Sequence, residues 1–502
     1  MMTARELIQA ATAHPCQPWP RHELEPEAWA ALTQALTQSP EIELRALWAD
    51  TTHIHAFLHD REHGDFLFAS VAVESGLYTA LSPARPAAAW VERMIRDLWG
   101  HTAADGTDLR PWLDHGQWTA TPPMAARPLP NLAAPDPMEF LPSEGPDLHH
   151  VAVGPVHAGI IEPGHFRFTG SGETVVRLEI RLGYLHKGTL ALLRGKSPRA
   201  AARFSARLSG DSTVAHSVAF AQAAEAACAT TPPPRALALR GVMAELERVA
   251  NHLGDVGAII GDAAFPLLQA RFIQQREAIL RVSNTAFGHR LMMDAVIPGG
   301  VAQDLNDTGA DAIAAALDAL QAELPQLNRV YIDTASLVDR MAGTGTLAPA
   351  LATQFAPGGV IGRASGQPGD ARRNPCYPPY DRLDVSAPMI DAGDVDARVC
   401  IRLAEISESI RVLRILLMEL PEGPITAPLP MASGEGVGCA EGFRGDIWHW
   451  LRLESGLITQ AFLCDPSWRQ WPLLEAAVEG NIVADFPLCN KSFNCSYSGV
   501  EL

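Results

Sequence analysis

The sequence predicts an α+β protein in two parts, and three observations lead to that prediction. Eight prolines fall between Thr121 and Pro146, and prolines break helices and remove donors from sheets, so residues 121–147 are expected to form a linker. Strand-like segments precede the linker, and helical apolar stripes dominate the chain after it. We therefore predict a small α+β domain over residues 1–120. Residues 148–502 should form a mainly α-helical bundle domain with a small antiparallel sheet.

The first part is expected to contain an early helix, neighbouring strands and a closing helix. The early helix runs around Glu27 to Thr37, and the β-branched and aromatic segments 42–60 and 66–76 follow it as strands. Apolar positions at helical spacing then continue over residues 90–100, where the glycine is placed to stop the helix. This order indicates a small α+β unit.

The second part combines a sheet with amphipathic helices. Segments 148–168 and 173–188 alternate like paired strands. Apolar stripes run through 236–255 and 396–424, so both segments are expected to be core helices of a bundle. The first stripe consists of Leu239, Val242, Met243, Leu246, Val249 and Leu253. The remainder of this part is expected to be mostly helical.

Composition excludes several classes of function. The chain has 57 acidic and 39 basic residues and a formal net charge of −18, which repels a phosphate backbone, so nucleic acid is not an expected partner. No stretch reaches the ~20 uncharged apolar residues that cross a bilayer, and the N-terminus lacks the apolar core of a signal peptide. We therefore expect a cytoplasmic chain with no direct membrane span. The eight cysteines form no CxxC pair, which favours buried thiols in a reducing compartment.

Two motifs in the first part point to a family. PAAAWVERMIRDLWG, at residues 86–100, is followed by DLRPWLDHGQW at 108–118. Together they resemble the signature of the complex I 30-kDa subunit. A generic amphipathic helix is the alternative interpretation of the first motif.

An ordered set of motifs also runs from Val151 to the C-terminus. It consists of GPVHAGIIEPGHFRF, RLGYLHKG, AELERVANHL, IPGGVAQDL, GRASGQPGDAR and ADFPLCNKSFNCSYSG. This order resembles the complex I 49-kDa subunit and the large subunit of membrane-bound NiFe-hydrogenases, and the first motif is closer to the hydrogenase form. The chain is thus identified as a fused 30-kDa-like and 49-kDa-like large subunit.

The resemblance predicts that the nickel–iron centre of the hydrogenases is lost. Such a centre needs four thiolates, supplied as two CxxC pairs, because soft sulfur ligands hold nickel and bridge it to iron. The first pair falls on Ser209 and Ser212, and the second falls on Ser496 and Gly499. Cys495 could reach the site in a shifted register, but one thiolate cannot hold two metals. We therefore expect no metal and no hydrogenase activity.

Further family positions depart in the same region. A glutamate of the hydrogenases falls on Leu190. The quinone-binding tyrosine of complex I falls on Gly210, and its hairpin histidine falls near Pro163, with His165 two residues away. The usual quinone contacts are therefore not predicted, and quinone is kept as a candidate acceptor.

Polar side chains replace the metal ligands in this alignment. They are Ser209, Asp211, Ser212, His216, Asn494 and Ser496. An aspartate beside a histidine couples their protonation, so Asp211 and His216 are catalytic candidates together with His157. The serines, Asn494 and Cys495 are candidates for cofactor contact. A proton path or small-molecule cavity is one interpretation, and a satisfied polar network with core histidines is the other.

Two candidates lie outside that cluster. Glu245 interrupts an apolar stripe and resembles a family glutamate that faces the proton-input region, so it is the fourth catalytic candidate, with a surface salt bridge as the alternative. In GRASGQPGDARR, the side chains of Arg363, Asp370 and Arg372 can pair within the loop. The family uses this loop to shape the cavity near an adjacent iron–sulfur cluster, which makes Arg363 and Asp370 cofactor-binding candidates. A structural clamp is the alternative.

The resemblance implies a role within a larger assembly. The chain is expected to be the large subunit of a membrane-associated oxidoreductase related to NADH-quinone oxidoreductase and energy-converting hydrogenases. A small iron–sulfur subunit would deliver electrons to a metal-free cavity, and antiporter-like and anchor membrane subunits would couple this to ion translocation at the inner face of the cell membrane. No glycine-rich nucleotide fingerprint is present, and in complex I another subunit oxidises NADH. The alternatives are a scaffold with a decayed redox site and, third, an active hydrogenase.

Overall fold

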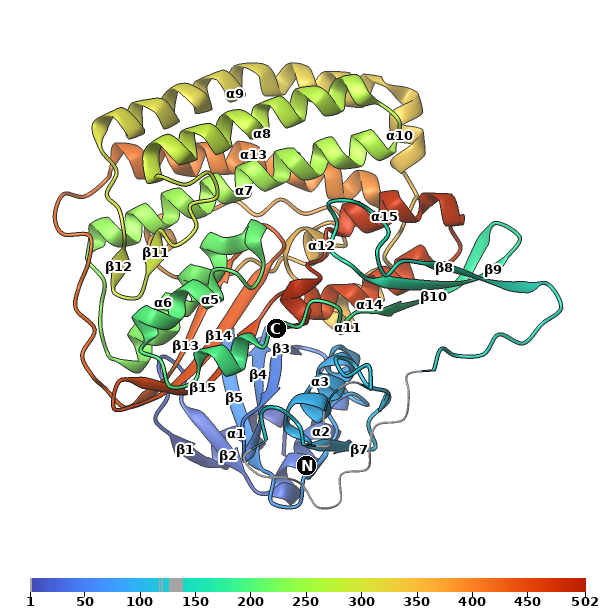
Figure 1. The fold of residues 1–502 in the computed structure, drawn as a ribbon, viewed down its shortest axis with the longest axis vertical. Helices are drawn as coiled ribbons and strands as arrows, with labels where there is room; N and C mark the ends of the chain where they lie inside the picture. The colour runs from blue at the N-terminus through green and yellow to red at the C-terminus, as the bar shows by residue number, and fades with distance from the viewer. Residues whose placement is uncertain (1, 117, 119–120, 126–138) are drawn as a thin grey trace.

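The computed structural model describes residues 2–116, 118, 121–125 and 139–502. In Figure 1 the N-terminal sheet, drawn in blue, lies at one end of the molecule, and a layer of long helices lies at the other. Helices and several separate sheets coexist, which confirms the predicted α+β class. Residues 126–138, the centre of the predicted linker, lie outside the described part of the chain, and the domain boundaries stay predictions.

The N-terminal part is a five-stranded sheet in the order β1-β2-β5-β4-β3. Its strands are β1 (Thr12–His14), β2 (Arg21–Leu24), β3 (Ile42–Ala49), β4 (His53–Asp60) and β5 (Asp65–Ala72). The predicted helices are α2 (Pro26–Thr37) and α3 (Ala89–Trp99), and α3 ends at Gly100, whose φ of 79° only glycine adopts without strain. The part is completed by α1 (Ala4–Ala10) and by the parallel pair β6 (Leu77–Thr79) and β7 (Thr102–Ala104).

The helical layer contains the two predicted core helices. They are α7 (Pro234–Asp262) and α13 (Val395–Met418), and Figure 1 shows them beside α8 (Pro266–Phe287) and α9 (Asp307–Asp333). All six apolar residues of the predicted stripe on α7 are fully buried, as expected for a core helix. In the described residues, no helix is long and apolar enough to span a membrane. Shorter elements connect the layers: α10 (Ala335–Met341), α11 (Pro349–Phe355), α12 (Gly359–Arg363), β11 (Val296–Ile297) and β12 (Gly300–Val301).

The predicted paired strands form an antiparallel sheet in the order β10-β9-β8. The first long segment supplies β8 (Leu148–Val153) and β9 (His165–Ser171), and the second supplies β10 (Thr174–Arg181). Short helices lead from this sheet into the bundle: α4 (Thr189–Leu193), α5 (Pro198–Ser205) and α6 (Thr213–Ala227).

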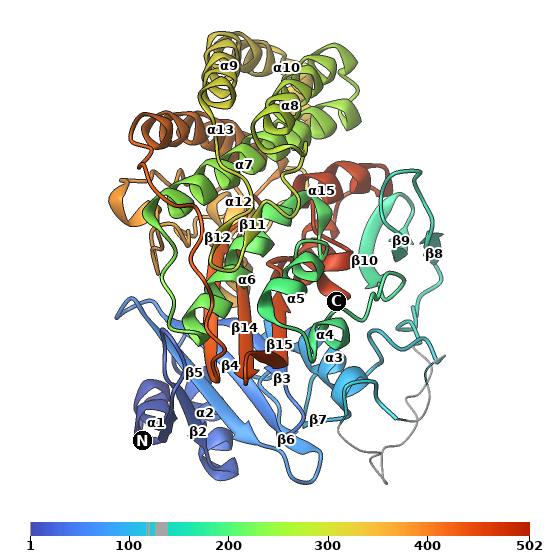
Figure 2. The same ribbon diagram turned by 60° about the vertical axis from the view of Figure 1, so that its left-hand side comes forward.

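The prediction that the rest of the second part is mostly helical was wrong over residues 434–464. These residues form a second antiparallel sheet of β13 (Gly434–Glu441), β14 (Asp446–Glu454) and β15 (Leu457–Cys464). Figure 2 shows this sheet between α6 and the N-terminal strands. The strand β13 begins GEGVG, and glycines weaken strand propensity, so the segment does not look like a strand in sequence. The chain then ends with α14 (Ser467–Val478) and α15 (Phe486–Phe493).

The glycines of β13 allow α6 to lie directly on the strand. Gly434, Gly436 and Gly438 all point at α6, and a Cβ on each would overlap backbone oxygens at successive turns of that helix. The facing residues are Ala219, Ala223 and Ala227, which recur every fourth position. Every second residue of β13 therefore faces every fourth residue of α6.

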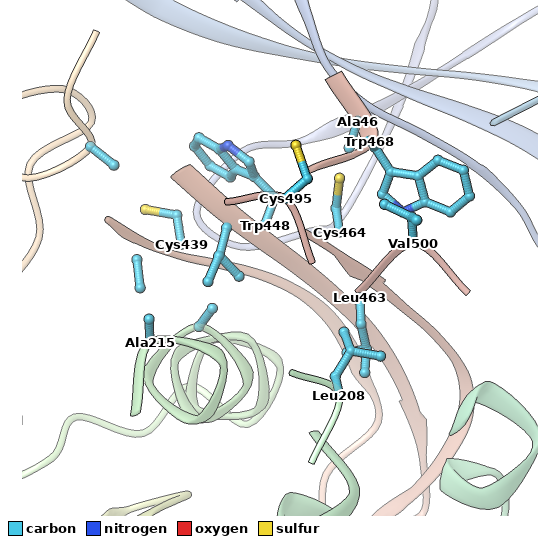
Figure 3. Close-up of a cluster of buried hydrophobic side chains, with 14 of the residues drawn as sticks. Ala46, Leu208, Ala215, Cys439, Trp448, Leu463, Cys464, Trp468, Cys495 and Val500 are labelled. Carbon is cyan, nitrogen blue, oxygen red and sulfur yellow. The ribbon is translucent and has the colours of Figure 1, made fainter. Parts of the chain in front are cut away.

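The two sheets pack face to face across a buried aromatic seam. Trp48 of β3 stacks on Phe462 of β15 with ring centroids 5.5 Å apart, and Arg452 of β14 binds Asp50 at 2.8 Å. Figure 3 shows another part of the buried cluster, in which Ala46 of β3 lies near Cys464 of β15 and Trp468 of α14. The N-terminal part is thus joined to the rest by both apolar and ionic contacts.

Candidate functional site

The positions that align with the two hydrogenase cysteine pairs meet in space. Ser209 and Ser212 bound a short turn before α6, and Ser496 follows α15. The Ser209 and Ser496 hydroxyl oxygens are 2.8 Å apart, and the Gly499 N–H donates to Ser496 Oγ at 3.0 Å. We call Ser209, Ser212 and Ser496 the serine cluster.

An arginine that the sequence analysis missed fills the centre of the serine cluster. Arg444, in the turn between β13 and β14, donates to both carboxylate oxygens of Asp211 at 2.7 and 2.6 Å. The same guanidinium lies 3.5 Å from Ser209 Oγ and 3.4 Å from Ser212 Oγ. Its Nε donates to the Asn494 carbonyl at 2.5 Å, where a left-handed φ of 51° ends α15. A fixed cation therefore lies among the positions that the resemblance assigns to the metal ligands of hydrogenases.

The ionised form of Asp211 is stabilised by Arg444. Partial burial opposes its ionisation, but Arg444 and the Ser209 hydroxyl lower the pKa of Asp211 below its ordinary value. Its side chain is still 39 % exposed, so water shares in stabilising the carboxylate. A cavity of about 10 Å³ lies beside Asp211 and is lined also by Glu247 and Asn251. This corner is therefore filled by side chains.

We expect Arg444→Met to lower the free energy of unfolding by about 2 kcal/mol at pH 7, less than the 3–5 kcal/mol of a fully buried pair because Asp211 is partly hydrated. Since the folded pKa of Asp211 lies below its unfolded value, the pairing stabilises above about pH 4 and is lost as the pH falls through the folded value. Urea midpoints at pH 7 and pH 3.5 should show the gap between wild type and variant shrinking on acidification. Arg207→Met, which breaks an exposed pair with Asp294, is the control and should cost below about 1 kcal/mol. A gap that is equal at both pH values would contradict the assignment.

The expected pairing of Asp211 with His216 was wrong. His216 is completely buried, and its Nε2 lies 3.0 Å from Asp465 while its Nδ1 lies 3.0 Å from His449 Nε2. Residue 211 belongs to the turn before α6, whereas residue 216 is one turn inside the helix and faces the C-terminal sheet. A hydrogen-bonded trio of Asp465, His216 and His449 therefore replaces the expected pair.

The Asp465 carboxylate fixes one hydrogen position in this trio. Because the Asp465 carboxylate can only accept, His216 Nε2 carries a hydrogen and donates to it, and His216 Nδ1 shares a second hydrogen bond with His449 Nε2. Burial holds the pKa of His449 well below its usual range, so it stays neutral, and its Nδ1 has no hydrogen-bond partner among the residues that the structure describes. Asp465 also accepts from the Ser467 N–H, and Ser467 Oγ accepts from the Ser496 N–H, so the trio connects to the serine cluster.

The remaining candidates near the cluster take other roles. His157, in the loop between β8 and β9, is hydrogen-bonded to the Pro155 carbonyl at 3.2 Å, and its ring lies against Phe166. His165, two residues after the aligned hairpin position, lies against the Gly154 carbonyl. Cys495 lies in the apolar cluster of Figure 3 beside Cys464 and Trp448, where burial raises the pKa of its thiol. It is therefore a poor thiolate donor.

Glu245, Arg363 and Asp370 lie in a separate buried network. Glu245 is fully buried and accepts from Tyr380 and Ser409 hydroxyls, both at 2.6 Å, so the alternative of a surface salt bridge was wrong. Arg372 binds Asp370 at 2.7 Å, and Arg363 approaches it at 3.5 Å, as the loop motif indicated. Four further members were not predicted from the sequence: Arg248 and His252 on α7, Glu405 on α13 and Glu441 on β13.

Comparison with known proteins agrees with this architecture. Residues 266–433 match the family described as the respiratory-chain NADH dehydrogenase 49 Kd subunit. The carbon monoxide-induced hydrogenase of Rhodospirillum rubrum is 30 % identical over 355 residues, which cover 70 % of this chain and 98 % of that protein. The chain belongs to the family of hydrogenase and complex I large subunits.

Other proteins are similar to this chain over comparable lengths. Formate hydrogenlyase subunit 5 of Escherichia coli is 28 % identical across 84 % of this chain and 76 % of its own. An NADH-quinone oxidoreductase subunit of Dehalococcoides mccartyi is 30 % identical across 60 % of this chain and 83 % of its own. A solved archaeal respiratory membrane complex, the membrane-bound sulfane sulfur reductase, contains a chain with a TM-score of 0.67 at 22 % identity, covering 71 % of this chain and 99 % of that one. That likeness concerns the fold.

The residues of this family member do not fit a nickel–iron centre. The aligned positions offer neutral hydroxyls and a glycine, and the nearby Cys495 thiol is held protonated by burial. The Arg444 guanidinium at the centre would repel a divalent cation. In the described ranges, no group of three or more His, Cys, Asp and Glu side chains could hold a metal ion.

Proposed function

We propose that this chain is a coupling and docking large subunit of a membrane-associated redox complex, in which an arginine replaces the metal centre. The observation that carries the proposal is the Arg444 guanidinium, held by Asp211 and the serine cluster. The relatives are hydrogenases and NADH-quinone oxidoreductase subunits, which supports a place in such a complex. Residues 1–120 would be its 30-kDa-like domain and 148–502 its 49-kDa-like domain.

The proposed partners follow the family. A small iron–sulfur subunit would pack against the chain and carry the proximal cluster, and antiporter-like and anchor subunits would hold the assembly at the inner face of the cell membrane. No nucleic acid partner is proposed, because the net charge is −18. The chain itself would supply docking surfaces and buried charges, and it would hold no NiFe centre.

A second candidate is reduction of an acceptor such as a quinone beside Asp211, with ion translocation driven by that step. The observation in its favour is that 39 % of the Asp211 side chain is exposed next to a cation and the Asp465–His216–His449 trio. The filled corner argues for the docking role, since about 10 Å³ is far below the ~300 Å³ of ordinary ligand pockets.

Metal analysis of the chain purified with its partners tests the proposal. We expect iron in a co-purified partner and no stoichiometric nickel, because hydroxyls and an arginine cannot bind it. A hydrogenase relative processed identically is the positive control. Reduced complex should then fail to be reoxidised by added quinone, followed through the iron–sulfur signal. One nickel per chain would return the protein to the hydrogenases, and rapid reoxidation by quinone would favour the second candidate.

A further inference from the structure

A network of eight ionisable side chains is buried where α7, α13 and the loop after α12 meet the end of β13. None of its members is more than 5 % exposed. Its carboxylates are Glu245, Asp370, Glu405 and Glu441, its guanidiniums are Arg248, Arg363 and Arg372, and its one imidazole is His252. We call this set the charge network.

Three of the four carboxylates are well compensated. Glu245 faces Arg372 at 3.2 Å and Arg248 at 3.3 Å, in addition to its two hydroxyl donors. Asp370 receives a two-pronged bond from Arg372, with Arg363 at 3.5 Å. Glu405 binds Arg363 at 2.6 Å and His252 at 2.7 Å.

Glu441 has the fewest partners. One of its oxygens lies 3.0 Å from Arg363, a cation that Glu405 and Asp370 share. The other accepts the Ala371 N–H at 2.9 Å and no further donor from the described residues. Glu441 is therefore the member whose negative charge is least stabilised.

With all four carboxylates ionised and His252 neutral, the charge network has a net charge of minus one. Four carboxylates face three guanidiniums, and an uncompensated charge in a site this dry costs several kcal/mol. Neighbouring ions are already paired: Asp446 with Arg469 at 2.7 Å, and Arg402 with Asp255 at 3.1 Å. One bound proton would balance the network.

Two groups could hold that proton, and the surroundings favour Glu441. Burial lowers the pKa of His252, and Arg402 and Arg248 oppose its imidazolium form although Glu405 favours it. Burial and the nearby Asp370 raise the pKa of Glu441 to about 7. Tyr377, whose hydroxyl accepts the Glu441 N–H, stays a neutral phenol because burial holds its pKa well above its usual range.

A cavity of about 370 Å³ lies against this network. Gly369, Asp370 and Ala371 form one wall, and the opposite side is lined by side chains of β3 and β4 that include Arg45 and His59. This wall also contacts the charge network on its other side. The Gly369 carbonyl accepts from the Arg363 guanidinium, and the Ala371 N–H donates to the Glu441 carboxylate. A single loop therefore separates the Glu441 carboxyl from this cavity.

We propose that the charge network is a binding site for one exchangeable proton, carried by Glu441 and reached through the cavity behind residues 369–371. A solvent proton forms an O–H bond with the carboxylate and leaves again as the carboxylate ionises, with no oxidation or reduction. The site is independent of the serine cluster and of whether the chain reduces an acceptor, so it goes beyond the proposed function.

Infrared titration of the purified full chain, with any partners that co-purify, tests this proposal. We expect a buried protonated-carboxyl band that titrates near neutral pH and is lost in Glu441→Gln. In Asp370→Asn three carboxylates face three guanidiniums, so the same band should shift to acid by more than about one pH unit. Glu475→Gln removes a partly buried carboxyl outside the network, whose pKa is also raised, and should leave the Glu441 band in place.

Two results would overturn the proposal. The first is a neutral-pH band that is unchanged in both Glu441→Gln and Asp370→Asn, which would place the proton elsewhere. The second concerns access: in D₂O the band should shift within minutes in the folded chain, and a band that shifts only on unfolding would exclude the cavity route. If Glu441→Gln fails to fold, Asp370→Asn and the D₂O shift of the wild type still decide.

Discussion

Gly438→Val should destabilise this protein by about 3 kcal/mol or more, although valine is one of the best strand formers. A Cβ at this position overlaps the carbonyl oxygen of Ala219 and approaches the Ala223 nitrogen, and both atoms belong to the backbone of α6. Backbone cannot rotate away as a side chain can, so either the helix lifts off the sheet or β13 is displaced. The first methyl carries most of the cost, and Gly438→Ala should lose nearly as much.

Chemical denaturation followed by tryptophan fluorescence measures the effect, because Trp448 and Trp450 lie on the adjoining strand β14. The matched control is Gly159→Val, an exposed loop position where a Cβ would meet nothing within 4 Å, and it should change stability by less than about 0.5 kcal/mol. Equal midpoints for the two variants would show that α6 does not rest on the β13 glycines.

The sequence predicted those elements whose side chains repeat with a clear period. The stripe on α7 identified a core helix because all six of its residues face one way, and Gly100 marked the end of α3 because only glycine takes that conformation easily. The meeting of the segments around Ser209 and Ser496 followed from a resemblance, since 287 positions separate them in the chain. No local pattern could have brought them together.

The misses share a physical cause. The strand β13 was missed because its packing partner requires glycine, which is the residue least typical of strands. Arg444 was then missed because it lies in the turn that follows this strand. The Asp211–His216 pairing failed because a short turn and a helix send neighbouring residues in different directions, and Asp465, the true partner, is 249 positions away. Side-chain direction is decided by tertiary packing, which local sequence does not contain.

Arg363→Met should cost about 3–5 kcal/mol, because the variant keeps the side-chain length but leaves buried carboxylates without their cation. Arg363 is fully buried, binds Glu405 and Glu441, and donates to the Gly369 carbonyl at 2.7 Å. Arg363→Lys should recover only part of the loss, since a single ammonium cannot reach the carboxylates of two different elements. The control is Arg414→Met, which removes a half-exposed arginine paired with Asp318 and should cost below about 1 kcal/mol.

The pH dependence of Arg363→Met separates lost charge from lost packing. Without the guanidinium, the folded pKa of Glu405 should rise above its unfolded value, and the folded pKa of Glu441, which is already raised, should rise further. A carboxyl group with a raised folded pKa supports the fold below its unfolded pKa, and that support is lost as the pH rises through the folded value. Urea midpoints at pH 5 and pH 8 should therefore show the gap to wild type widening with pH. A gap that stays constant would mean that Arg363 acts by filling space, and the charge balance of the network would then need no bound proton.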